Sequence, residues 1–123
     1  VLAPTIRYAN PAALEDLSGV HGSVDFAMTF TVLMHMTDAD ARKVLDAIRL
    51  KAKGGWVLIV ERTDSGQVLG DNSSSAEFMD HGRSVATFEE WMKPFKLVRP
   101  LPRVVEPTYP RKDNGMYMLF SDA

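Results

Sequence analysis

The sequence predicts an α/β fold, in which helices flank a mainly parallel sheet. Three consecutive segments support this prediction: an apolar strand at residues 24–30, an amphipathic helix after Thr37, and a second apolar strand at residues 56–60. Strand, helix and strand in this order form the right-handed crossover unit of parallel sheets. Because neither strand alternates strictly, we expect helices on both faces of the sheet and the two strands adjacent and parallel.

The first elements are a short strand at residues 5–8 and a helix that begins at Asn10. Asn is a strong helix N-cap, and Pro11 fits the first helical position because it lacks an N–H. Leu14 and Leu17 should form the apolar side of this helix, which is expected to end near Gly19.

The central helix is the best-defined element in the sequence. Thr37 is its predicted N-cap, and acidic residues in the first turn suit the positive end of the helix dipole. Gly54 and Gly55 supply the C-cap. The apolar positions recur at helical spacing and predict the buried stripe Ala41, Val44, Leu45 and Ile48.

The carboxyl-terminal part begins with a predicted loop at residues 63–75, which is rich in Gly, Asn, Asp and Ser. Thr87 and Glu90 form a capping-box pattern, so a short helix is expected to begin there. Two β-like runs follow at residues 97–105 and 116–120, and we expect them to close the sheet as an antiparallel hairpin. Two prolines in the first run favour an edge position.

Composition limits the classes of function. The chain has 123 residues, which we take as one partial domain spanning residues 1–123, and a net charge of −2, which gives no basic face for nucleic acid. No apolar run approaches the ~18 residues that span a bilayer. The absence of cysteine excludes disulfides and thiolate sites and fits a cytoplasmic location. A start at Val1 without a signal pattern fits a processed terminus or a piece of a longer polypeptide.

Two motifs and the tail hairpin carry a family resemblance. Residues 24–36 (VDFAMTFTVLMHM) have the pattern of an Asp-led strand that ends in Leu-x-His-hydrophobic, and residues 44–59 have the pattern vL-x-x-i-x-r-x-L-k-x-G-G-x-l-i-i. Together these segments resemble the class I, Rossmann-like S-adenosylmethionine-dependent methyltransferases, from the fourth strand onward. That family inserts an antiparallel seventh strand between its fifth and sixth strands, where this chain has its hairpin. The resemblance covers residues 5–121.

The resemblance implies a partial Rossmann-like methyltransferase sheet, S-adenosylmethionine as cofactor and a small-molecule methyl acceptor. The family's glycine-rich loop and the acidic residue that binds the ribose have no counterpart here. These two features hold most of the cofactor in such folds. We therefore expect the lone chain to bind S-adenosylmethionine weakly or not at all, and to be inactive without an amino-terminal half.

The resemblance also assigns site residues. Asn10 lies where the family contacts the adenine, although a helix N-cap uses the same side chain. Thr29, Phe30 and Thr31 end a strand at the carboxyl edge, where open α/β sheets bind ligands, but strand ends need no ligand. His35 lies beside the methyl donor, where an imidazole orients an acceptor or takes its proton; capping of the local backbone is the alternative.

Other polar and large residues have simpler interpretations. Glu61 and Arg62 are expected to form a surface ion pair after the second apolar strand. His81 and Arg83 follow the predicted loop, near where the resemblance implies an acceptor lid. No metal site is predicted there, because a second histidine or carboxylate at ligand spacing is missing. Core or pocket-wall positions are expected for the two tryptophans and the seven methionines.

Three classes of function remain open. The first is a methyltransferase completed by a missing half, and the second is a non-catalytic remnant that acts in oligomerisation or binding. A third, another nucleotide-binding Rossmann protein, lacks the G-x-G-x-x-G motif. In the family the lost strands neighbour the strand at residues 24–30, so its edge should recruit another strand. We expect a two-fold homodimer there, or docking of the amino-terminal half, rather than pairing with the short strand at residues 5–8, which could cover only part of the edge.

Overall fold

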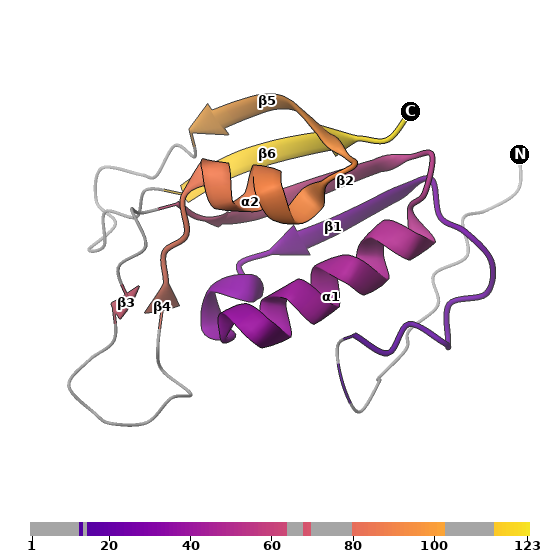
Figure 1. The fold of residues 1–123 in the computed structure, drawn as a ribbon, viewed down its shortest axis with the longest axis horizontal. Coiled ribbons are helices and arrows are strands. Elements are labelled where there is room, and N and C mark those ends of the chain that lie inside the picture. Colours follow the sequence, from indigo (N-terminus) through magenta and orange to yellow (C-terminus); the bar gives the residue numbers. More distant parts are fainter. Residues whose placement is uncertain (1–12, 14, 64–67, 70–79, 103–114) are drawn as a thin grey trace, which may run out of the picture.

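The computed structural model describes residues 13, 15–63, 68–69, 80–102 and 115–123. A four-stranded sheet in the order β1-β2-β6-β5 forms the centre, and a two-stranded hairpin, β3-β4, projects from one end (Figure 1). The strands are β1 (Phe26–Phe30), β2 (Trp56–Arg62), β3 (Val68–Leu69), β4 (Asp80–His81), β5 (Lys96–Pro102) and β6 (Gly115–Ser121). The helices are the short 3₁₀ turn η1 (Leu33–His35), α1 (Asp38–Lys51) and α2 (Val85–Met92).

The sheet confirms the predicted α/β class and strand pairing. β1 and β2 are adjacent and parallel, with Phe26 opposite Trp56. β6 lies antiparallel between β2 and β5, as the resemblance implied for the tail hairpin. β5 is an edge strand, as expected from Pro100 and Pro102, since proline cannot donate to a neighbouring strand.

Helix α1 follows its sequence signals closely. The Thr37 hydroxyl accepts a hydrogen bond from the Asp40 N–H at 3.3 Å, and all four predicted stripe residues are buried. The helix ends at Lys51 with Ala52 as its C-cap, and Gly54, with a left-handed φ of 80°, turns the chain toward β2. The predicted start of this helix is confirmed, whereas its C-cap is Ala52, two residues before the predicted glycines.

Helix α2 begins earlier than predicted. Its N-cap is Ser84, whose hydroxyl accepts from the Thr87 N–H at 3.2 Å, so Thr87 lies within the first turn and the capping-box prediction was wrong. The earlier start brings Val85 against the core, and this apolar contact favours the longer helix.

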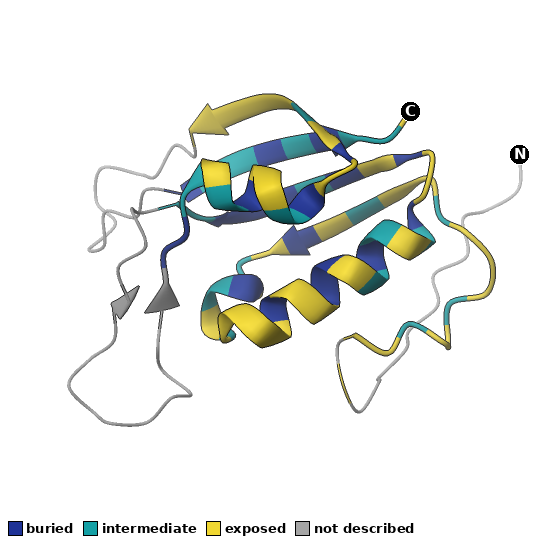
Figure 2. Cartoon of the chain, viewed as in Figure 1, coloured by how far each residue is buried: buried dark blue, intermediate teal, exposed yellow. Residues whose placement is uncertain are grey.

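Both described helices cover the same face of the sheet (Figures 1 and 2). Their apolar residues pack with alternate residues of β2 and β6 in one core: Val57, Ile59, Met118 and Phe120. On the opposite face Phe26 is 52% exposed and Met28 is 57% exposed. In the part of the chain that the structure describes, the prediction of helices on both faces is therefore wrong. Nor are Met28 and Trp56, which is 39% exposed, core residues.

Two further sequence predictions differ from the structure. Residues 15–19 form turns and not the end of a helix, because the Asp16 carboxylate accepts from the Ser18 N–H at 3.1 Å and competes with helical bonding. Within the predicted loop at residues 63–75, Val68 and Leu69 form β3 and pair with β4. The predicted strand at residues 5–8 and the helix start at Asn10 lie outside the described residues.

Candidate functional site

The loop between β1 and α1 lies at the carboxyl end of the parallel strands, the edge where open α/β sheets bind ligands. Thr31 begins this loop: its N–H donates to the Val60 carbonyl at 2.8 Å, and its φ of 52° is left-handed. That conformation is uncommon for a residue other than glycine and persists where surrounding contacts fix it. The turn η1 follows and leads into the cap of α1.

Glu61 of β2 supplies those contacts from the neighbouring strand. The residue is 1% exposed, and one carboxylate oxygen, Oε1, accepts from the N–H groups of Val32 and Leu33, each at 2.9 Å. The other oxygen, Oε2, accepts from the Met34 N–H at 3.2 Å. The first N–H groups of a helical turn have no partner within the turn, so the Glu61 carboxylate caps η1.

Two opposing effects act on the protonation of Glu61. Burial raises the pKa of this carboxyl above the ordinary glutamate value, because a charge is costly away from water. The three N–H donors and the positive charge of Arg83 favour the ionised form and offset part of this rise. The net direction of the pKa is upward.

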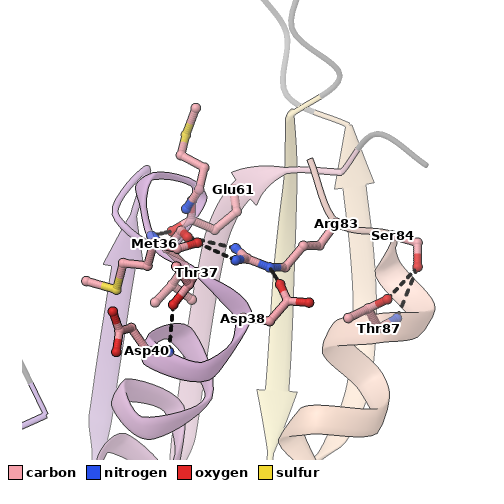
Figure 3. Close-up of polar contacts among 10 residues, drawn as sticks. Met36, Thr37, Asp38, Asp40, Glu61, Arg83, Ser84 and Thr87 are labelled. Carbon is pink, nitrogen blue, oxygen red and sulfur yellow. Dashed lines mark hydrogen bonds and ion pairs between the residues drawn. The ribbon is translucent and has the colours of Figure 1, made fainter. Parts of the chain in front are cut away.

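Arg83, just before α2, holds the other side of the same loop (Figure 3). Its side chain is 5% exposed. Nη1 donates to the Leu33 carbonyl at 2.7 Å and Nη2 to the Met36 carbonyl at 2.5 Å, while Nε meets the Asp38 carboxylate at 2.8 Å. The guanidinium also lies 5.4 Å from the centre of the Trp91 ring, within the range of a cation–π contact.

Glu61 and Arg83 therefore bind different polar groups of the same loop. Glu61 accepts from its N–H groups, and Arg83 donates to its carbonyls. Leu33, which is fully buried, is held in both ways, by its N–H and by its C=O. We call this arrangement of Glu61 and Arg83 around residues 32–36 the loop clamp.

The predicted site residues fall at different places around this loop. His35 is exposed at the end of η1; its N–H donates to the Val32 carbonyl at 3.2 Å, and its imidazole has no polar partner among the described residues. Thr31 is half-buried. Thr29 faces the helices, is 6% exposed, and its hydroxyl has no hydrogen-bond partner in the described part of the chain. Phe30 faces the opposite side of the sheet, and Asn10 lies outside the described residues.

The structure thus brings Thr31 and His35 into one loop and places Thr29 in the core. Among the described residues, no glycine-rich loop follows β1 or β2.

The surface ion pair predicted for Glu61 and Arg62 is wrong, because Glu61 is buried and its oxygens bind backbone N–H groups. One signal in the sequence pointed to its burial. Val57, Ile59 and Glu61 alternate along β2, so the carboxylate continues the row of residues that faces the helices. Arg83 had no comparable signal.

Other kinds of site are not found among the described residues. They contain no cluster of histidine, cysteine, aspartate or glutamate that could hold a metal ion. None of the described helices is long and apolar enough to cross a membrane.

Comparison with solved structures places this architecture among known folds. A S-adenosylmethionine-dependent methyltransferase from Methanosarcina mazei matches with a TM-score of 0.67 at 16% identity, covering 88% of this chain and 63% of that protein. The 1,6-didemethyltoxoflavin N1-methyltransferase of Burkholderia thailandensis, solved with its substrate and S-adenosylhomocysteine, matches with a TM-score of 0.66 at 16% identity, covering 88% and 47%. No family model and no curated protein sequence matches the chain.

The chain has the fold of the class I S-adenosylmethionine-dependent methyltransferases. It spans about half to two thirds of the length of these two proteins. The same architecture also occurs in an enzyme of a pericyclic reaction, which matches with a TM-score of 0.56 at 14% identity, covering 81% of this chain and 26% of that protein. A shared fold therefore does not fix the reaction.

Proposed function

We propose that this chain acts in S-adenosylmethionine-dependent methyl transfer to a small-molecule acceptor, as part of a larger or assembled domain. The observation that carries the proposal is the ordered loop at the carboxyl edge of β1 and β2, within a sheet of the methyltransferase strand order. Both matched methyltransferases have this fold, and one was solved with a small-molecule substrate.

The proposed role of the chain is to form the methyl-donor side of the site. S-adenosylmethionine supplies an electrophilic methyl group, and transfer depends mainly on in-line placement of the acceptor. Thr31 and the backbone of the loop line the cofactor's methionine end. His35, which is exposed and free of polar partners among the described residues, orients the acceptor or accepts its proton.

The rest of the cofactor site must come from another segment. In this proposal it is contributed by an amino-terminal half or by a partner chain placed against β1. The half-exposed Phe26 and Met28 support this, because apolar side chains on a strand face favour a covering partner. The same observation favours the alternative function, a non-catalytic module that uses this face for oligomerisation or binding.

Calorimetric titration with S-adenosylhomocysteine tests the proposal. We expect weak or undetectable binding to this chain, and clear binding to a longer natural form or to the assembled complex. Sub-micromolar affinity of the lone chain as a monomer would contradict the view that most cofactor contacts come from elsewhere. Absence of binding in every form would leave the non-catalytic module as the better account.

A further inference from the structure

Burial of Glu61 and Arg83 in the loop clamp costs free energy, and a gain in stability does not explain why charged side chains occupy these positions. A buried carboxylate and a buried guanidinium each lose hydration, and apolar side chains of similar volume often stabilise such a position equally well or better. What apolar side chains cannot do is fix the direction of each N–H and C=O group in the loop. The structure assigns Glu61 and Arg83 as positioning residues, which hold residues 31–36 in the one conformation that presents Thr31 and His35 to a ligand.

The contacts support positioning because they come from two distant parts of the chain. Glu61 belongs to β2, and Arg83 precedes α2, so the loop conformation depends on the assembled sheet and helices. Every N–H from Val32 to Met34 has Glu61 as its partner, and the carbonyls of Leu33 and Met36 have Arg83. Thr31, in its left-handed conformation, lies immediately before this held segment.

Trp91 supports Arg83 from behind and offers an internal control. The guanidinium of Arg83 lies 5.4 Å from the centre of the indole ring, and that of Arg42, on α1, lies 5.8 Å from the same ring. Of these two arginines, Arg83 donates to the loop carbonyls and Arg42 does not. Loss of the Arg42 contact therefore perturbs the tryptophan environment without releasing the loop.

Amide hydrogen exchange on the full chain tests the Glu61 side of the clamp. In Glu61→Ala the amides of Val32, Leu33 and Met34 should all exchange faster, on the order of tenfold to hundredfold, because each loses a charge-assisted bond. Glu61→Gln should be selective. An amide oxygen can replace Oε1 for Val32 and Leu33, whereas the NH₂ group would face the Met34 N–H, so Met34 should be released most.

The amide of Ala52, which bonds the Ile48 carbonyl in α1, reports whether each variant remains folded. If its protection is kept while the loop amides are released, the effect is local. Protection of all three loop amides in Glu61→Ala equal to that of the wild type would overturn the clamp. If Glu61→Ala fails to fold, the selective loss at Met34 in Glu61→Gln decides the question.

The Arg83 side is tested by nuclear magnetic resonance of the His35 ring. Arg83→Met should shift the His35 ring resonances, because the loop that carries the ring loses two carbonyl contacts; Arg83→Lys should restore part of the wild-type spectrum. The matched variant Arg42→Met should leave these resonances in place. Equal shifts in Arg42→Met and Arg83→Met would show that tryptophan stacking, and not the clamp, fixes the loop.

The positioning role rests on the proposed function. Ligand binding by the variants is therefore measured separately from amide exchange. In a form that binds S-adenosylhomocysteine, Glu61→Gln and Arg83→Met should weaken binding at least tenfold, and Arg42→Met should not. Release of the loop amides with unchanged affinity would refute positioning while leaving the function intact. If no wild-type form binds, the proposed function and the ligand-positioning role both fail, while the amide exchange still shows whether the clamp holds the loop.

Discussion

Glu61 shows how a single residue can be misjudged from sequence alone. Its alternation with Val57 and Ile59 was sufficient to predict burial, but its partners are backbone N–H groups that lie 27 to 29 positions earlier in the chain. Those partners exist only after β1 pairs with β2 and the loop turns at Thr31. Arg83 is harder still, since its carbonyl partners carry no side-chain signal at all.

The sequence was more informative about the residues that end a parallel strand. Thr31 and His35 were predicted to lie near the ligand edge, and both lie in the loop at that edge. Alternation within β1 separates the neighbouring residues, so Thr29 faces the helices and Phe30 the opposite side. Whether any of these residues contacts a cofactor stays a prediction.

The pKa of Glu61 makes a prediction about pH. Because burial raises this pKa above 4.5, the folded chain binds the proton more tightly than the unfolded chain. The contribution of Glu61 to stability is therefore complete below 4.5 and declines as pH rises through the folded value. The free energy of unfolding of the wild type relative to Glu61→Gln should decrease over this window, as measured by urea titration at several pH values.

Glu90 provides the matched control for that measurement. It is an exposed glutamate whose pKa is lowered by its hydrogen bond and ion pair with Lys93. Its contribution to stability is therefore complete above pH 4.5 and is lost only as the pH falls below that value. Glu90→Gln should show no decrease of this kind above 4.5. A difference between wild type and Glu61→Gln that grows with pH would mean that the three N–H donors and Arg83 outweigh burial.

At the scale of elements, the sequence predicted helix features correctly where the interacting residues are close together in the chain. The N-cap of α1 and its apolar stripe act within a few residues, and both were confirmed, whereas its C-cap is Ala52 and the predicted Gly54 lies in the turn that follows. The start of α2 was wrong because Ser84 and Thr87 both offer a capping hydroxyl, and contact of Val85 with the core favours the earlier one. Residues 15–19 do not form the predicted helix, because the Asp16 carboxylate accepts a hydrogen bond from the Ser18 N–H.

The junction between α1 and β2 gives a prediction for element packing. A Cβ atom on Gly55 would lie 2.4 Å from the backbone oxygen of Asp25, which also accepts the Trp56 N–H. A backbone oxygen cannot rotate away, so Gly55→Ala should destabilise the fold by about 1–3 kcal/mol through forced displacement of β1. Thermal or urea unfolding measures this loss.

Gly54 is the control next to it. A Cβ atom there meets nothing within 4 Å, and only the left-handed φ of 80° resists substitution. Since asparagine tolerates that conformation better than other residues, Gly54→Asn should cost less than Gly55→Ala. An equal or larger loss for Gly54→Asn would show that backbone conformation, and not the contact with Asp25, limits this junction.

At the scale of the whole molecule, the family resemblance predicted the order of the strands. The sequence did not predict that the described helices cover only one face of the sheet. The strand at residues 24–30 is mostly apolar without strict alternation, which is typical of a strand covered on both faces, yet Phe26, Met28 and Phe30 are about half exposed. A sequence pattern reports that a strand suits a covered position. It does not report which segment or chain provides the cover.

The outer edge of β1 and its exposed apolar face favour assembly with a second chain. No described strand pairs with the outer edge of β1, and an open apolar edge tends to recruit another strand. We expect this chain to form a two-fold dimer through β1, because symmetric pairs are the commonest soluble assemblies. Light scattering over a range of concentrations should give a mass that rises from monomer to dimer.

Met28→Lys should shift this equilibrium toward the monomer, because it places a charge in the centre of the proposed interface. Leu50→Lys is the matched control: Leu50 is 77% exposed on α1, which covers the other face of the sheet, so a charge there should leave the dimer unchanged. A monomer mass at every concentration would exclude the dimer. If adding an amino-terminal methyltransferase half then protected the β1 amides, the same edge would be occupied by that half, and the apolar face would have its cover without a second copy.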